Sequence, residues 1–163
     1  MKLEEIEKIA MNYLRLLEPY CERVRIAGSI RRRKAECNDI ELVCVRYDDE
    51  RERSKFVAIV NRWEKVKGEP EGRYTQRILP EGIKLDLFMA NKDNWGNIFL
   101  IRTGNWVFSR FMMGIRAKQV GLIHREGYLW SQGYDEKYPC YEEEDVFHYL
   151  CMDYVKPEDR EWE

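Results

Sequence analysis

Gly28-Ser29-Ile30-Arg31-Arg32-Arg33, followed by Asp39-Ile40-Glu41, is the stretch that decides the fold. Residues 24–27 before it predict a short strand that runs into the glycine, and residues 40–45 predict a second strand. Side chains two positions apart on a strand share a face, so the two carboxylates project together while the aliphatic residue between them packs inward. The stretch therefore predicts a sheet with one apolar face and one face that carries acids.

A third carboxylate lies on a later segment, residues 83–89, in which polar and apolar residues alternate. Lys84 and Asp86 share the polar face of this predicted strand. If it lies beside the first acidic strand, three carboxylates converge. Neighbouring carboxylates repel each other unless a cation lies between them, and hard oxygen ligands suit Mg²⁺. Three of them are enough to hold two metal ions for an in-line phosphoryl transfer, whereas the alternative is a solvated sheet face.

The residues before the acidic pair suit the other end of such a reaction. Gly28 lets the backbone approach a phosphate closely, and Ser29 can cap a short helix whose N–H groups point at an anion. The arginine run at residues 31–33 follows within one turn, so at least one guanidinium should reach the same phosphates. The alternative for the run is a solvated basic patch.

The order of elements predicts an α+β fold: a mixed sheet with helices on one face, followed by a small, mainly helical C-terminal subdomain. We place the two subdomains at residues 1–93 and 94–163. Hydrophobic periodicity and turn residues predict helices at residues 3–18, 52–63, 95–101, 106–120 and 142–150, strands at 74–79 and 83–89, and a hairpin at Glu126-Gly127.

The composition of the 163 residues narrows the class of protein further. The net charge is only −2, but residues 23–34 carry six basic side chains and no acid, which indicates a localised anion site. The five cysteines form no CxxC pair, so we do not expect a structural zinc site. Their number and spacing fit a reducing cytoplasm. No apolar run approaches the roughly 20 residues of a membrane span, and the N-terminus is unlike a signal peptide.

Taken together, these residues resemble a known group of enzymes. Gly28-Ser29 with Arg31-Arg32, then Asp39-x-Glu41, then a strand with Asp86, is similar to the nucleotidyltransferase superfamily. Thr103-Gly104 opening a helix, Gly121-Leu122 before a hairpin, and the ending from Tyr154 to Arg160 resemble the C-terminal subdomain of DNA polymerase family X, the DNA polymerase beta-like enzymes.

The resemblance implies roles for particular residues. Asp39, Glu41 and Asp86 would be the catalytic carboxylates and would hold two Mg²⁺ ions, for which Mn²⁺ can substitute; Asp86 would also orient the primer 3′-hydroxyl. The remaining implied contacts fall into two groups: Gly28, Ser29, Arg32, Thr103, Gly104, Asn105 and Ser109 toward the nucleotide, and Lys84, Arg110, Arg116, Lys118 and Arg125 toward DNA, with Lys84 also holding the carboxylates in register. The last four basic residues could equally be solvated surface.

The resemblance implies a DNA-directed DNA polymerase that joins a deoxynucleoside monophosphate to a primer 3′-end and releases pyrophosphate, as in short-gap repair. Its partners would be primer–template or gapped DNA and deoxynucleoside triphosphates, with no membrane. We expect a monomer in the cytoplasm, or in the host's nucleic-acid compartment if the source is viral. The alternatives are a small nucleotidyltransferase with a non-DNA acceptor and a non-catalytic DNA-binding module.

Several positions depart from the family pattern. Glu41 stands in place of the usual aspartate, and Ile101-Arg102 replaces the aromatic pair before Thr-Gly. The replacement predicts looser discrimination against ribonucleotides; the alternative is that Thr103-Gly104-Asn105 keeps the same backbone turn and deoxyribose remains strongly preferred. Asn105 stands where a serine is usual, Ser109 where an asparagine often contacts the base, and Met113 where an arginine often supports the template. We expect the aromatics of this region to be core residues: Trp95, Phe99, Trp106, Phe108 and Phe111.

Overall fold

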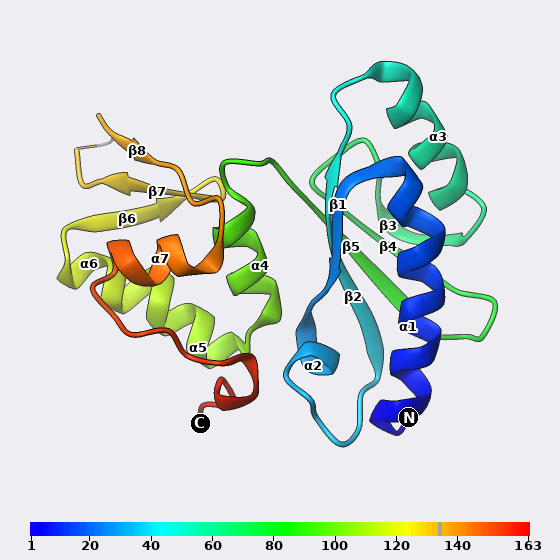
Figure 1. Cartoon of the computed structure of the whole chain (residues 1–163), viewed down its shortest axis with the longest axis horizontal. Helices are drawn as coiled ribbons and strands as arrows, with labels where there is room; N and C mark the ends of the chain where they lie inside the picture. Colours follow the sequence, from blue (N-terminus) through cyan, green and yellow to red (C-terminus); the bar gives the residue numbers. More distant parts are fainter. Residues whose placement is uncertain (134) are drawn as a thin grey trace. The chain divides into compact units, whose positions relative to one another are not determined.

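The computed structural model describes residues 1–133 and 135–163. These residues form two compact units, Met1–Ala90 and Asn91–Glu163 (Figure 1). The division falls three residues before the 93/94 position that we placed from the sequence.

The N-terminal unit is built on a five-stranded sheet in the order β1-β2-β5-β4-β3. The central strands β2 and β5 are parallel, and every other neighbouring pair is antiparallel. The strands are β1 (Cys21–Ile26), β2 (Asp39–Arg46), β3 (Glu64–Gly68), β4 (Tyr74–Ile78) and β5 (Lys84–Ala90). The two predicted acidic strands are therefore direct neighbours in the middle of the sheet.

Helices cover one face of this sheet. They are α1 (Leu3–Leu17), which continues into a 3₁₀ turn at Glu18–Tyr20, and α3 (Glu50–Val60), and Figure 1 shows both on the same side. The helical spacing of Ile6, Ala10, Leu14 and Leu17 aligns one apolar stripe of α1, which is buried against the even-numbered residues of β2. Burying each large aliphatic side chain contributes about 1.5–3 kcal/mol, so this layer stabilises the unit. A short helix, α2 (Gly28–Arg31), links β1 to the loop before β2.

One predicted boundary shifts and one strand was not predicted, each for a local reason. Helix α3 begins at Glu50, because the Asp49 carboxylate accepts a hydrogen bond from the Glu52 N–H at 3.0 Å and caps the helix. Strand β3 was not predicted at all. All its residues are exposed, so no alternation marks it, and lysines at 65 and 67 suit an edge strand.

The C-terminal unit combines helices with a three-stranded antiparallel sheet in the order β6-β7-β8. Its elements are α4 (Trp95–Thr103), α5 (Trp106–Arg110), a π-helical segment (Phe111–Arg116), α6 (Ala117–Gln119), β6 (Leu122–Arg125), β7 (Tyr128–Ser131), β8 (Lys137–Tyr138), α7 (Glu143–Tyr149) and a 3₁₀ turn (Pro157–Asp159). The expected helix over 106–120 is thus one run with a π-helical middle. Glu126 and Gly127 both have positive φ, as a two-residue hairpin turn requires.

A buried arginine fastens the end of the chain to this unit. Arg160 is fully buried, and its guanidinium pairs with Glu143 at 2.6 Å and donates to the Val155 carbonyl at 2.9 Å. The rings of Phe108, Phe147 and Tyr154 surround it at 5.3–5.6 Å. A buried cation needs such partners, because an unpaired charge in an apolar core is strongly destabilising.

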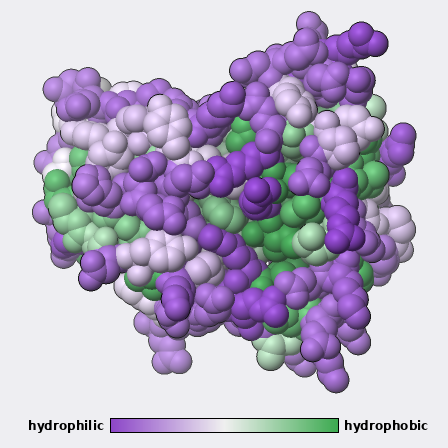
Figure 2. Space-filling view, in the orientation of Figure 1, coloured by the Kyte–Doolittle hydropathy of each residue, from purple (hydrophilic) through white to green (hydrophobic). Residues whose placement is uncertain are grey.

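The surface is polar, as the 36% of charged residues predicts. Figure 2 shows one face of the molecule as mostly hydrophilic, with hydrophobic side chains in separate patches. Among the described residues, none of the helices has the length and hydrophobicity that crossing a bilayer requires.

Candidate active site

Four charged residues form a block on the sheet face opposite α1 and α3. In the parallel pair, Asp39 is the register partner of Lys84, and Glu41 is the register partner of Asp86. Register partners project to the same face, and the intervening Ile40 and Leu85 are fully buried on the other one. The expectation that the two acidic strands are neighbours is confirmed. We call Asp39, Glu41, Lys84 and Asp86 the charged block.

Asp86 is the most buried carboxylate of the charged block, with an exposed fraction of 6%. Its Oδ1 accepts hydrogen bonds from the Tyr74 hydroxyl and from the Gln76 amide, the latter at 2.8 Å. Both donors come from β4, the strand on the other side of β5. Tyr74 is itself held, since its ring stacks on Phe88 with centroids 5.0 Å apart. The carboxylate plane of Asp86 is therefore fixed through one oxygen, and Oδ2 is left for another partner.

The pKa of Asp39 is raised by its position in the charged block. Burial raises the pKa of its carboxyl, and the negative charge of Asp86 raises it further. A backbone N–H of its own residue, Lys84 and Arg32 oppose the rise without cancelling it. A carboxyl whose ionisation is opposed by burial and by a neighbouring carboxylate favours the arrival of a cation.

Glu41 explains why residue 28 is glycine. Gly28 has a φ of +60°, and a Cβ built on it would lie 1.5 Å from the Glu41 carboxylate oxygen Oε2. A side chain at residue 28 would therefore displace Glu41 and strain the backbone. The backbone of β1 and β2 reinforces this approach, since the Ala27 N–H donates to the Glu41 carbonyl at 2.8 Å.

The prediction that Ser29 caps the short helix is wrong. Helix α2 begins at Gly28 with Ala27 at the cap position, so Ser29 lies inside the first turn. The arginine run also divides. Arg33 forms an ion pair with Glu7 of α1 at 2.5 Å, whereas Arg32 lies close enough to Asp39 to lower its pKa. The Arg32 guanidinium thus acts on the charged block.

The donor chemistry of the charged block fits a hard divalent cation. Carboxylate oxygens are the ligands that Mg²⁺ prefers, and a cation would relieve the effect of the Asp86 charge on Asp39. As the side chains stand, no three His, Cys, Asp or Glu side chains of the described residues are grouped closely enough to hold an ion. The residues that would hold one are Asp39 and Asp86, with Glu41 beside Asp86 in the register.

In the C-terminal unit, the residues predicted to bind the nucleotide mostly have structural partners. Thr103 and Gly104 close α4, and the expectation that they open a helix is wrong. Asn105 opens α5: its Oδ1 accepts from the Phe108 N–H at 3.0 Å, and its Nδ2 donates to the Trp162 carbonyl at 2.8 Å. The buried Ser109 hydroxyl donates to the Ile101 carbonyl at 2.9 Å and ties α5 to α4. Thr103 is fully buried.

The basic residues predicted to meet DNA separate into two kinds. Arg110, Lys118 and Arg125 are exposed. Arg116 instead donates to the carbonyls of Leu150 at 2.8 Å and Cys151 at 3.0 Å, which follow α7. Its guanidinium therefore satisfies backbone acceptors at a helix end, a structural task.

One aromatic residue departs from the core that we expected. Trp106 is 68% exposed, and the Arg110 guanidinium lies 5.8 Å from the centre of its ring. Trp95, Phe99 and Phe108 are buried as predicted, and Phe111 is partly buried against the core.

Comparison with known proteins bears on the C-terminal unit. Residues 98–161 match the family model described as DNA polymerase beta thumb. No curated protein matches the chain significantly. The C-terminal subdomain is thus similar to a polymerase beta thumb, as its motifs indicated.

Proposed function

We propose that this chain is a DNA polymerase of the family X type, which extends a primer 3′-end by one deoxynucleotide at a time on gapped or primer–template DNA. The observation that carries the proposal is the pairing of Glu41 with Asp86 and of Asp39 with Lys84 on one sheet face. The match of residues 98–161 to a polymerase beta thumb supports DNA as the acceptor.

Each member of the charged block has a task in this proposal. Asp86, oriented through Oδ1, presents its other oxygen to the attacking 3′-hydroxyl. Lys84 is exposed beside Asp39 and balances its negative charge. Outside the charged block, Arg32 binds the triphosphate. Bound Mg²⁺ would supply the positive charge that stabilises the transferring phosphoryl group. Asp39, Glu41 and Asp86 would hold it.

Primer extension tests the proposal. The full chain is incubated with Mg²⁺, deoxynucleoside triphosphates and a one-nucleotide gapped duplex, beside the variants Asp86→Asn and Asp153→Asn. Asp153 is exposed and lies in the other unit, so its variant controls for loss of one negative charge. We expect Asp86→Asn to lose at least about 10²-fold in rate, because the group nearest the attacking oxygen is changed.

Two results would contradict the proposal. One is extension by Asp86→Asn at the rate of the unchanged chain. The other is no extension of any primer by the unchanged chain under conditions in which circular dichroism shows it folded. The second result would favour a small nucleotidyltransferase with a non-DNA acceptor.

A further inference from the structure

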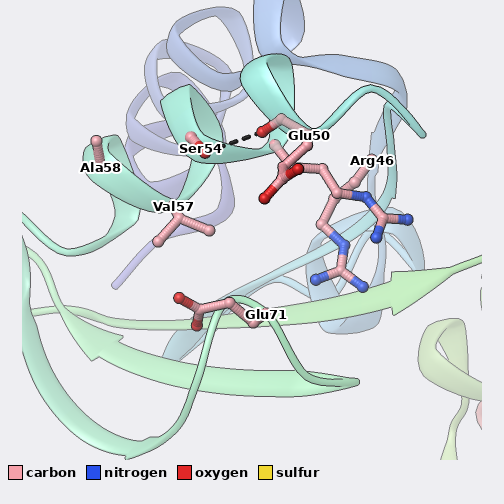
Figure 3. Close-up of a pocket in the computed structure, with 7 residues that line it drawn as sticks. Arg46, Glu50, Ser54, Val57, Ala58 and Glu71 are labelled. Atoms are coloured by element: carbon pink, nitrogen blue, oxygen red, sulfur yellow. Dashed lines mark hydrogen bonds between the residues drawn. The ribbon is translucent and has the colours of Figure 1, made fainter.

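A cavity of about 360 Å³ lies beside α3 (Figure 3). Its wall includes Arg46 at the end of β2, Glu50 and Arg53 of α3, and Glu71 from the loop between β3 and β4. Side chains alternate along β2, so Arg46 lies on the face opposite Asp39 and Glu41. The cavity is therefore separate from the charged block.

Two arginines form a prepared anion-binding wall in this cavity. Arg46 donates from Nη1 to the Pro70 carbonyl at 2.6 Å, and Arg53 donates from Nε to the Tyr47 carbonyl at 2.7 Å. These carbonyls orient the guanidinium groups without neutralising them. Burial lowers the pKa of Arg46, and the nearby positive charge of Arg53 lowers it further, although the carboxylate of Glu71 partly opposes the change. Asp48 compensates Arg53 weakly, since it lies 3.5 Å away and its side chain is 95% exposed.

Two carboxylates complete the cavity without closing it. Figure 3 shows the Glu50 and Glu71 side chains around the same open space as Arg46. Within residues 1–133 and 135–163, neither of these carboxylates makes an ion pair or a side-chain hydrogen bond. The cavity thus offers donors on one side and acceptors on the other, with Val57 and Ala58 as its apolar part.

This combination restricts the ligand. A guanidinium pair matches the oxygens of a phosphate. A bare phosphate, however, would leave the two carboxylates without donors and would be repelled by them. A nucleic-acid strand would bring further phosphates against the same carboxylates. A single phosphate linked to neighbouring hydroxyl groups satisfies both sides, and the hydroxyls of a ribose are such donors.

We propose that the cavity binds a ribonucleoside monophosphate, with its phosphate on Arg46 and Arg53 and its ribose hydroxyls on Glu50 and Glu71. This site is distinct from the nucleotide site of the proposed polymerase, because it lies on the other face of the sheet and uses none of the same residues. The proposal stands whether or not the chain extends a primer.

Isothermal titration of the full chain with three probes tests it: adenosine monophosphate, its 2′,3′-dideoxy analogue and inorganic phosphate. We expect adenosine monophosphate to bind most tightly. Arg53→Ala should lower the affinity for adenosine monophosphate about tenfold or more, because hydrogen bonds to charged groups are stronger than those between neutral groups. Arg62→Ala, an exposed arginine just after α3, is the matched control and should change nothing.

Glu71→Ala separates this site from a general anion patch. This variant should lower the affinity for adenosine monophosphate, because it removes a hydrogen-bond acceptor for the ribose. It should raise the affinity for inorganic phosphate, because it removes a negative charge that repels the anion. A misfolded variant would lose both ligands. Arg32→Ala should leave binding unchanged. Binding that depends on Arg32 and not on Arg53, or equal affinity for the three probes, would overturn the proposal. So would the same direction of change for both ligands in a Glu71→Ala variant that circular dichroism shows to be folded.

Discussion

At the scale of single residues, Asp86 is held in place by its neighbours Tyr74 and Gln76, which donate to the same oxygen. Tyr74→Phe keeps the ring that stacks on Phe88 and removes only the hydroxyl. Because a hydrogen bond to a charged group is worth about 1.5–3 kcal/mol, we expect primer extension to slow by about ten- to a hundredfold.

The loss should appear in kcat and leave the KM for nucleotide nearly unchanged, since the hydroxyl contacts Asp86 and not the predicted triphosphate site. Single-turnover kinetics measures this, with Tyr141→Phe as a control at an exposed tyrosine. Unchanged kcat in Tyr74→Phe would show that Asp86 needs no such support.

Asp39 gives a second prediction at this scale. An acid whose folded pKa is raised makes the folded state less stable above that pKa, because the unfolded chain ionises more readily. We therefore expect Asp39→Asn to raise the Tm at pH 7 and to have little effect at pH 3, where the carboxyl is protonated in both states. Thermal unfolding followed by circular dichroism at the two pH values measures this. A lower Tm at pH 7 would mean that Lys84 and Arg32 compensate the charge fully.

At the scale of elements, helix α7 and the chain end depend on one buried ion pair. Glu143→Gln leaves the Arg160 charge buried without its carboxylate, and breaking a buried pair in this way costs about 3–5 kcal/mol. Glu144→Gln is the neighbouring exposed control, for which a change within about 0.5 kcal/mol is expected. Urea unfolding followed by tryptophan fluorescence reports both, and equal stability of the two variants would contradict the role of the pair.

The same scale shows which elements the sequence could predict. The apolar stripe of α1 is a strong signal because one face of the helix is buried, and the Glu126-Gly127 turn carries its own backbone requirement. Strand β5 was predicted from Lys84 and Asp86 standing between apolar residues, although every residue of it after Lys84 is buried. Strand β3 carries no such signal, because no residue of it is buried.

The two hydrogen bonds that hold the Asp86 carboxylate were also not predicted. Tyr74 and Gln76 are two apart on β4 and so share a face, which the sequence alone shows. Their meeting with Asp86 depends on the register between β4 and β5, which no local pattern determines. The structural roles of Asn105, Ser109 and Arg116 likewise depend on partners distant in sequence, such as Trp162 and Leu150.

At the scale of the whole molecule, the net charge of −2 means that any affinity for DNA must come from local basic groups. The exposed cations of the C-terminal unit include Arg110, Lys118 and Arg125, and the guanidinium of Arg116 donates to backbone carbonyls. Each phosphate contact adds about −0.9 to the slope of log affinity against log salt, so few contacts give a shallow slope and weak binding.

We therefore expect the DNA affinity of the full chain to fall with a slope of about −2.7 if Arg110, Lys118 and Arg125 each meet one phosphate. Replacing Arg110, Lys118 or Arg125 singly by alanine should reduce the magnitude of this slope by about 0.9 each, with the fold intact. Arg116→Ala should instead lower the Tm, because the carbonyls after α7 lose their donor, and should leave the slope unchanged. Fluorescence anisotropy with a labelled gapped duplex over a salt series measures these slopes. An unchanged slope in the three single variants, or a slope that falls in Arg116→Ala at unchanged Tm, would place the DNA-binding surface elsewhere.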